Sequence, residues 1–256
     1  MDIRIGTPFE LSILSEQVAA FYKKEWPRAI SLGDIDFYNW QFIKTPYQKN
    51  NDSCCIVVNE KNHILGVMGV NDRRFILNNK VCFGAELTTW IILPEFRGLG
   101  LARKTINYLQ DKYDVLFGMG ISKDALKVYL QSGFYYLKAI PRFIKVIDWE
   151  IVEKYADYTS LAKGVDKYWK DRDTTVYDFC HRAVNQDSLQ KICDCFYLEN
   201  NLFSRNIEYI NWRYITHPKF KYDITIIASH NDSLGCFVAT RTEKCSAGFE
   251  ILHIID

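Results

Sequence analysis

The segment from Arg97 to Ala102, Arg-Gly-Leu-Gly-Leu-Ala, carries the clearest chemical signal in the sequence. It follows an apolar run and opens a stretch with helical periodicity, so it lies at a strand-to-helix turn. Amides at the start of a helix have no partner within the helix, and the helix dipole adds about half a positive charge there. Glycines let a phosphate approach such a backbone closely. The segment therefore predicts an anion site, to which Arg97 and Arg103 add positive charge.

Two other phosphate-binding motifs do not fit this segment. No Gly-Lys-Ser or Gly-Lys-Thr follows it, as a P-loop requires, and its glycine spacing differs from the dinucleotide-binding fingerprint. On these residues alone, the glycines could also serve only to turn the chain between the strand and the helix.

The elements around this segment predict an α/β fold, in which a mixed sheet has helices on both faces. Strands are expected at residues 2–7, 53–59, 64–77, 80–93, 115–119, 134–137 and 142–148. Helices are expected at residues 10–22, 34–43, 101–113 and 123–132. Asp34 is the expected N-cap of the second helix, and Asn78-Asn79 is the expected turn of a hairpin.

The composition is that of an ordinary globular protein, and it limits the kinds of partner. The 256 residues are 48% hydrophobic and 25% charged, with a net charge of +1. No run of Lys or Arg exceeds two residues, so no nucleic-acid partner is expected. No apolar stretch approaches the roughly 20 residues that cross a bilayer, and the first residues do not resemble a secretion signal. We therefore expect a cytoplasmic protein without a membrane span.

The eight cysteines do not predict a metal site. Cys193 and Cys195 are too close together for a zinc knuckle, and no histidine follows at ligand spacing. Most cysteines lie within apolar runs, as buried thiols do in a reducing compartment.

Part of the pattern recurs in the C-terminal half. Trp40 and Pro46 align with Trp212 and Pro218 inside similar aromatic segments, and apolar strands follow each segment. We expect a complete unit at residues 1–148 and a partial second unit at 149–256, which stops before its own glycine-rich turn. One anion site is therefore expected. The alternative is two unrelated segments that share an aromatic helix and two strands.

The sequence resembles the GCN5-related N-acetyltransferase (GNAT) superfamily at two motifs. The acetyl-CoA loop of that family reads Gln/Arg-x-x-Gly-x-Gly/Ala, which Arg97, Gly100 and Ala102 match at every fixed position. A later helix of the family often reads Ala-x-x-x-Tyr-x-x-x-Gly-Phe, as does the segment 125–134 with Tyr129. The resemblance covers residues 2–148 and, weakly, 175–256.

The resemblance implies a GNAT-like fold that binds acetyl-CoA as a co-substrate. The pantetheine arm would pair with backbone groups of Trp90, Ile91, Ile92 and Leu93. The pyrophosphate would lie on the amides of Arg97, Gly98, Leu99, Gly100, Leu101, Ala102 and Arg103. Tyr129 would protonate the departing thiolate, a task that suits a phenol with a pKa near 10, although it could simply pack on the sheet.

The resemblance also indicates which groups would meet the acceptor amine, whose nitrogen must lose a proton. Glu86 is the first candidate for the base and Asp72 the second, while Glu86 could also be an ordinary carboxylate at a strand edge. The strand period places Glu86 and Trp90 on one face unless a bulge intervenes. Trp40 and Tyr38 lie where the family usually binds the acceptor, and they would contact it or pack in the core.

These features predict an acyl-CoA-dependent N-acyltransferase that transfers acetyl from acetyl-CoA to a small-molecule amine by direct attack. A loose resemblance to tandem acetyltransferases of polysaccharide pathways suggests an amino sugar or a nucleotide-linked amino sugar as the acceptor. Two alternatives remain, a non-catalytic acyl-CoA-binding regulatory module and a peptidyl transferase that uses aminoacyl-tRNA. The open sheet edge of the partial unit could pair with a second copy to give a homodimer.

Overall fold

The computed structural model describes residues 2–48, 52–59, 61–140, 144–148, 150–151, 154, 179–182, 186–196, 202–229, 235–246 and 248–256. The chain forms two compact units, Met1–Tyr136 with Cys193–Lys219 and Leu137–Ile192 with Phe220–Asp256. A segment of the C-terminal half thus belongs to the first unit. The boundary expected near residue 148 was meant to separate two copies of a duplicated unit. That duplication stays a prediction.

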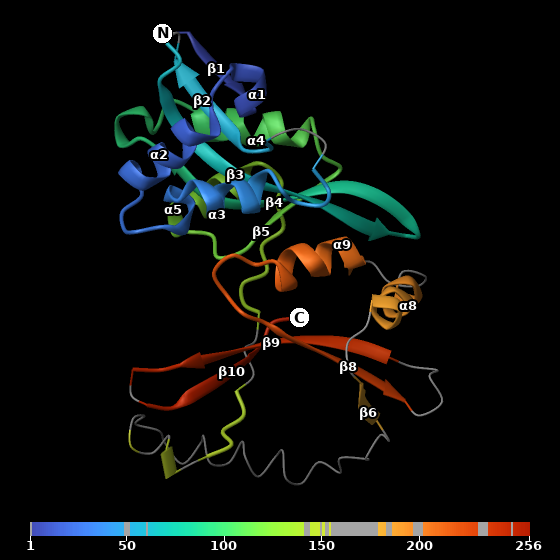
Figure 1. The fold of residues 1–256 in the computed structure, drawn as a ribbon. Coiled ribbons are helices and arrows are strands. Elements are labelled where there is room, and N and C mark those ends of the chain that lie inside the picture. The colour runs from blue at the N-terminus through green and yellow to red at the C-terminus, as the bar shows by residue number, and fades with distance from the viewer. Residues whose placement is uncertain are drawn as a thin grey trace. The chain divides into compact units, whose positions relative to one another are not determined.

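The first unit is built on a mixed sheet with the strand order β1-β2-β3-β4-β5 (Figure 1). These strands are β1 (Ile3–Gly6), β2 (Cys55–Asn59), β3 (Ile64–Leu77), β4 (Lys80–Ile92) and β5 (Val115–Gly118). Neighbouring strands are antiparallel except for β4 and β5, which are parallel. A short strand from the C-terminal half, β7 (Leu202–Phe203), pairs with the distal end of β3. The predicted mixed sheet is confirmed.

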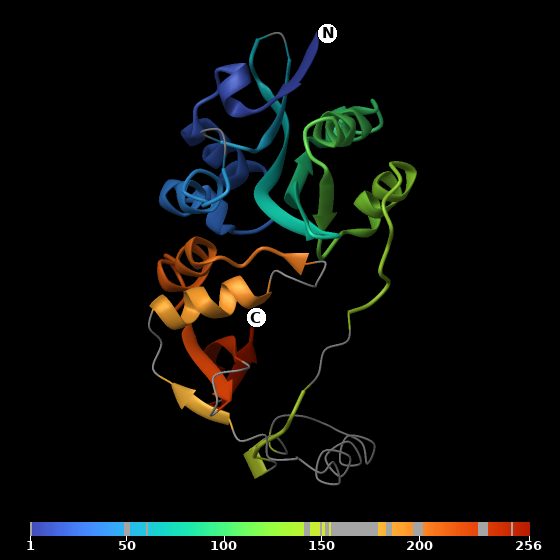
Figure 2. The same ribbon diagram turned by 90° about the vertical axis from the view of Figure 1, so that its right-hand side faces the viewer.

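Helices cover both faces of this sheet, as Figure 2 shows. The helices are α1 (Pro8–Leu11), α2 (Ser15–Glu25) and α3 (Ile35–Phe42) on one face, and α4 (Leu101–Gln110) and α5 (Lys123–Gln131) on the other. On the first face, Val18 and Tyr22 pack with Val67 of β3. On the second face, Ile106 and Tyr129 pack with Met68 of β3. Successive strand side chains point to opposite faces, so β2, which is buried throughout, is apolar from Cys55 to Val58.

Strands β3 and β4 form a long hairpin with the predicted turn at Asn78-Asn79. Both asparagines have positive φ, 49° and 61°, which a tight hairpin turn requires and which asparagine tolerates. The pairing has one irregularity near the other end of the hairpin. Met68 faces Trp90 and Gly69 faces Thr88, so Thr89 is an extra residue that forms a β-bulge on β4.

Two sequence expectations were wrong in detail. The single helix expected at 10–22 is divided, because Thr7 and Glu10 form a capping box that begins α1 and Ser12, with φ 55°, ends it. The strands expected at 134–137 and 142–148 are absent from 134–140 and 144–148, while 141–143 lie outside the described residues. Apolar alternation alone does not make a strand where the described residues offer no hydrogen-bonded neighbour.

The second unit contains an antiparallel sheet with the strand order β10-β9-β8-β6. Its strands are β6 (Phe179–Arg182), β8 (Asp223–Ser229), β9 (Gly235–Lys244) and β10 (Glu250–Ile254), and helix α8 (Gln186–Phe196) follows β6 in the sequence. Ile226 and Ala239 are buried on neighbouring strands of this sheet. Among the described helices, none is long and apolar enough to cross a membrane.

Candidate functional site

Strand β4 loses its parallel neighbour before it ends. Its pairing with β5 stops where Leu87 faces Gly118, although β4 continues to Ile92. On this side, the last part of β4 has no neighbouring strand among the described residues. The amide of Leu93 donates to the carbonyl of Leu65 at 2.9 Å, toward β3, while the carbonyl of Ile92 accepts from Arg97 Nε at 3.0 Å. Because backbone direction alternates along a strand, Trp90 and Ile92 are the residues whose backbone groups point to the open side.

The bulge at Thr89 lies at the point where the two strands part. Thr89 has φ +34°, which is uncommon for a β-branched residue. The hydroxyl of the buried Tyr22 donates to the Thr89 carbonyl at 2.9 Å, so α2 holds the bulge from one face of the sheet. A Cβ atom on Gly69 would lie 2.5 Å from Thr88 Oγ1 and 2.7 Å from Phe42 Cζ, so only glycine fits opposite the bulge.

The bulge corrects the expectation that Glu86 and Trp90 share a face. The extra residue reverses the alternation, so that Trp90 packs in the core beneath α4 and α5, whereas Glu86 faces the side of α2 and α3. Trp90 therefore contacts Tyr129 rather than Glu86. The two rings meet edge to face, with centroids 5.7 Å apart.

Helix α4 begins at the predicted glycine-rich turn. Gly98 and Gly100 have φ of +80° and +75°, and a Cβ atom on either residue would meet nothing within 4 Å. Gly100 is the N-cap, and no side chain caps the first helical amides. Leu101 is buried beside Val57 and Leu65 and so fixes the helix start to the sheet. A helix start without a side-chain cap, beside two glycines that border open space, fits an anionic group such as a pyrophosphate.

Tyr129 of α5 lies beside the end of β5. A Cβ atom on Gly118 would lie 3.9 Å from the Tyr129 hydroxyl oxygen, which places this hydroxyl where β5 leaves β4. The ring packs edge to face against Phe134 as well, with centroids 4.9 Å apart. Burial raises the pKa of Tyr129 to about 12. The phenol is therefore protonated at neutral pH and can act as a hydrogen-bond donor.

Glu86 forms an ion pair with Arg73 of β3, with 2.6 Å between its Oε2 atom and Nη2. The side chain of Arg73 is only 7% exposed and that of Glu86 is 18% exposed. The Arg73 guanidinium also lies over the rings of Tyr209 and Trp212, at 5.2 and 5.3 Å from their centroids. The carboxylate thus has a fixed position beside aromatic rings from the C-terminal half.

These rings come from a helical segment that follows β7. The segment consists of α9 (Ile207–Ile210) and a π-helical turn (Asn211–Ile215). Trp212 stacks on Trp40, with centroids 5.0 Å apart and planes at 20°. Each indole N–H donates to the backbone carbonyl of the other tryptophan, at 3.2 and 2.9 Å. The two tryptophans thus hold each other by two hydrogen bonds as well as by the ring contact.

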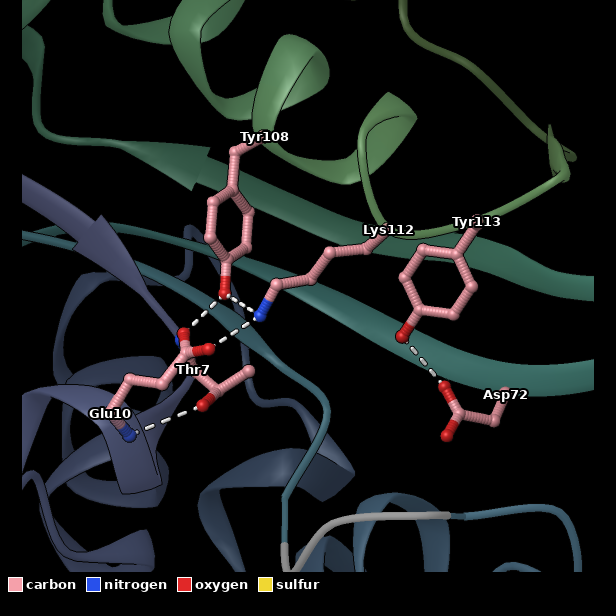
Figure 3. A network of polar contacts seen from close by, with 6 residues as sticks. All are labelled: Thr7, Glu10, Asp72, Tyr108, Lys112 and Tyr113. Atoms are coloured by element: carbon pink, nitrogen blue, oxygen red, sulfur yellow. Dashed lines mark hydrogen bonds and ion pairs between the residues drawn. The ribbon is translucent and has the colours of Figure 1, made fainter.

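The structure does not bring Asp72 or Tyr38 to this site. Asp72 is buried on the face of α4, where it accepts from the Tyr113 hydroxyl at 2.7 Å (Figure 3). It also accepts from the Ser53 hydroxyl at 3.1 Å. Tyr38 is fully buried beneath α3, and its hydroxyl donates to Asp52 at 2.7 Å. Neither side chain therefore reaches the space near Glu86.

A polar network ties α1 to α4 and to the residues just after it (Figure 3). Glu10 accepts from Lys112 Nζ at 2.6 Å, from the Tyr108 hydroxyl and from the Thr7 amide at 2.8 Å. Partial burial acts to raise the pKa of Glu10, but the hydrogen bonds from Lys112, Tyr108 and Thr7 outweigh it and lower the pKa to about 2. The network supports the helix that carries the glycine-rich turn.

Sequence reasoning missed several residues of the site. Arg73 stands in a run of two basic residues, and nothing in the sequence distinguishes it from exposed Arg74. Tyr22 and Thr89 meet only because a bulge forms. Trp212 was found as a repeat element, but its stacking on Trp40 was not foreseen. Cys54 is not a candidate nucleophile, because it is fully buried and burial raises the pKa of its thiol.

No metal-binding cluster of three or more His, Cys, Asp or Glu side chains occurs within the described ranges. The site combines four features. The parallel strands β4 and β5 separate, a bulge at Thr89 lies where they separate, helix α4 begins without a side-chain cap, and the phenol of Tyr129 is buried. Together with the helices on both faces, they define the class of N-acetyltransferase folds.

Comparisons with known proteins find a family match in the N-terminal part of the chain. Residues 15–134 match the acetyltransferase (GNAT) family, so the chain carries an acetyltransferase domain of that family. A comparison with curated proteins finds no match.

Solved structures of acetyltransferases are similar to the chain. A GCN5-related N-acetyltransferase from Anabaena variabilis is 12% identical with a TM-score of 0.55, and the match covers 99% of this chain and 57% of that one. Glucosamine-6-phosphate N-acetyltransferase from Arabidopsis thaliana is 16% identical with a TM-score of 0.38, covering 58% and 100%. An aminoglycoside N-acetyltransferase in complex with CoA is 18% identical with a TM-score of 0.39, covering 56% and 93%.

Proposed function

We propose that the chain transfers an acyl group, acetyl in the simplest case, from a CoA thioester to the nitrogen of a small amine by direct attack. The observation that supports this most is the coincidence of three features at one point. The β4–β5 pairing ends at Gly118, the Thr89 bulge lies on the facing part of β4, and the Tyr129 hydroxyl lies beside Gly118.

The residues present fit acetyl-CoA as the co-substrate, which would supply the activated acyl group. The amides from Gly98 to Arg103 would hold the pyrophosphate, because no side chain caps the helix start and the two glycines border open space. Within the expected segment Trp90 to Leu93, we assign the pantetheine contacts to Trp90 and Ile92. Ile91 and Leu93 would support them from the side that pairs with β3.

Tyr129 would donate a hydrogen bond to the sulfur as the carbon–sulfur bond breaks. With a pKa of about 12, the phenol is a weaker acid than a thiol, whose ordinary pKa is about 8.5. Complete proton transfer from Tyr129 is therefore unfavourable, and its contribution is stabilisation of the developing negative charge. Glu86 would take the proton that the attacking nitrogen loses, and the thiolate would leave with the electrons of the carbon–sulfur bond and be protonated from solvent. Atoms and charge are then conserved.

We assign Glu86 as the base that takes the proton from the acceptor amine. Its carboxylate lies one residue before the end of the β4–β5 pairing, on the face of α2 and α3. The ion pair with Arg73 competes with the amine for this carboxylate, so the acceptor must offer enough interaction to share it. Trp40 would act through Trp212, on which it stacks. An amino sugar is the acceptor type that we propose from these aromatic and acidic neighbours.

The test follows thiol release and acylated product when the full chain is incubated with acetyl-CoA and a panel of amines. Ala102→Asp places a negative charge at the first turn of α4 and should weaken acetyl-CoA binding about tenfold or more, because like charges brought together cost several kcal/mol. Asn107→Asp adds the same charge beyond the first turn, where the dipole effect has faded, and should leave binding unchanged.

Two results would contradict the proposal. Binding of acetyl-CoA without acylation of any amine would favour a regulatory acyl-CoA-binding module. Salt-dependent tRNA binding, with aminoacyl transfer in place of acetyl transfer, would favour the peptidyl transferase.

A further inference from the structure

Three polar side chains gather on the α2/α3 face of the β3–β4 hairpin: Asn71, Arg73 and Glu86. Asn71 faces Glu86 directly across the two strands, and Arg73 lies two residues further along β3, so all three point to the same face. Arg73 and Asn71 are buried, whereas 18% of the Glu86 side chain is exposed. The cluster is therefore reached from solvent through the carboxylate.

Arg73 is the only buried Lys or Arg among the residues that the structure describes. Nη2 donates to Glu86 at 2.6 Å, and Nη1 makes a long contact of 3.4 Å to the Asp72 carbonyl. A guanidinium has five N–H donors in a planar fork, which suits an oxyanion held by two parallel bonds. Within the described part of the chain, these two contacts use that capacity only in part, and the rings of Tyr209 and Trp212 keep the fork in place.

Asn71 provides an independent observation at the same place. Its side chain is 4% exposed, and its Oδ1 atom has no hydrogen-bond donor among the described residues. Buried polar atoms without a partner are rare in folded proteins. Since Asn71 faces Glu86 across the hairpin, a ligand bound at Glu86 could supply the missing N–H or O–H donor.

We propose that the acceptor amine of this enzyme also carries an anionic group, a phosphate or a carboxylate, which Arg73 binds while Glu86 takes the amine. The inference rests on the proposed acyl transfer and names the class of its acceptor. Charge balance supports it. Without an acceptor, Arg73 and Glu86 neutralise each other, and a buried charge that loses its partner is strongly unfavourable. An amine that draws Glu86 away must therefore bring a negative charge for Arg73.

The test uses pairs of acceptors that share the same amine and differ by a remote anion. Glucosamine and glucosamine 6-phosphate test the phosphate, and 5-aminopentanol and 5-aminopentanoate test the carboxylate. The anionic member of at least one pair should have a kcat/KM about 10 to 100 times higher, as expected for a charge-assisted hydrogen bond. The pair that shows the preference identifies which anion the site takes.

Variants at Arg73 test the residue itself. Arg73→Gln should abolish the preference for the anionic member, and Arg73→Lys, which keeps the charge without the fork, should retain part of it. Arg74→Gln is the matched control, because Arg74 is the next residue on β3 and is exposed, and it should retain the full preference. Circular dichroism and thermal melting establish that each variant is folded.

Two outcomes separate this inference from the proposed function. Acylation of neutral and anionic amines with equal kcat/KM would overturn the inference and leave acyl transfer intact. If no amine is acylated, calorimetry in the presence of CoA still measures binding of each anionic amine. Binding that Arg73→Gln weakens at least tenfold would support the anion site, and binding of neither anionic amine would overturn it.

Discussion

Replacing Tyr22 by phenylalanine tests whether the bulge on β4 is part of the catalytic machinery. The hydroxyl of Tyr22 is buried and makes two contacts with Thr89, at 2.9 Å to the carbonyl and 3.3 Å to Oγ1. Removing it leaves the carbonyl without this donor and should lower the free energy of unfolding by about 1–3 kcal/mol. For a protein of this size, each kcal/mol corresponds to about 2–4 °C in Tm.

The same change should lower acyl transfer more than stability alone explains. Thr89 is held at φ +34°, and without Tyr22 the bulge can relax toward ordinary strand geometry. A shift of this kind next to the reacting atoms should reduce kcat/KM about 10- to 100-fold, measured by thiol release at a temperature where the variant is fully folded. Binding of CoA at the glycine-rich turn should change little, because that turn does not contact Tyr22.

Tyr38→Phe is the matched control. Tyr38 is as deeply buried as Tyr22, and its hydroxyl donates to Asp52 at 2.7 Å, away from the bulge. It should lose comparable stability and keep its activity. Equal activity of the two variants would refute the reasoning, and so would an unchanged kcat/KM in Tyr22→Phe, because the bulge would then have no catalytic role.

Three further predictions concern single side chains. Tyr129→Phe should reduce kcat about 10- to 100-fold with little change in CoA affinity, since a hydrogen bond to a charged group is worth about 1.5–3 kcal/mol; an unchanged kcat would exclude its role at the sulfur. Glu86→Gln should lower kcat/KM by about 10²–10⁴ if the carboxylate is the base, and a fall of less than about threefold would leave it a structural role. Glu10 has a pKa lowered to about 2 from an ordinary value of 4.5, so it stabilises the fold above pH 4.5 and loses this effect as the pH falls toward 2. Because the Glu10 side chain is 45% exposed, its contribution to the free energy of unfolding should stay within about 1 kcal/mol. Urea unfolding at a series of pH values measures it. If wild type and Glu10→Gln lose stability in parallel over this pH range, Glu10 does not make this contribution.

Local chemistry was enough to predict much of the first unit. Asn78-Asn79 marks the turn of the long hairpin because few residues accept two successive positive φ angles. Asp34 caps α3 as expected, and its carboxylate accepts from the Asp36 amide. The glycine-rich turn before α4 could be read from the sequence because the required backbone conformation leaves little choice of residue.

The contacts of the site depend on register and could not be read in the same way. One extra residue at Thr89 moves Trp90 to the opposite face, and no residue type specifies that bulge. The partner of Glu86 is set by which residue of β3 lies diagonally across the hairpin, so Arg73 becomes visible only when the strands are paired. The expectation that Glu86 and Trp90 share a face, which held only without a bulge, was wrong for this reason.

The reciprocal contact between Trp40 and Trp212 limits where the chain can be truncated. The segment 15–134 that matches the family lacks Trp212 and the strand Leu202–Phe203, which cover one part of its sheet. A fragment cut at residue 134 would leave the Trp40 indole N–H without its acceptor and would uncover part of the β3 edge. The segment that matches the family is therefore incomplete as a structural unit. Truncation or recombination between residues 134 and 202 would separate these contacting segments.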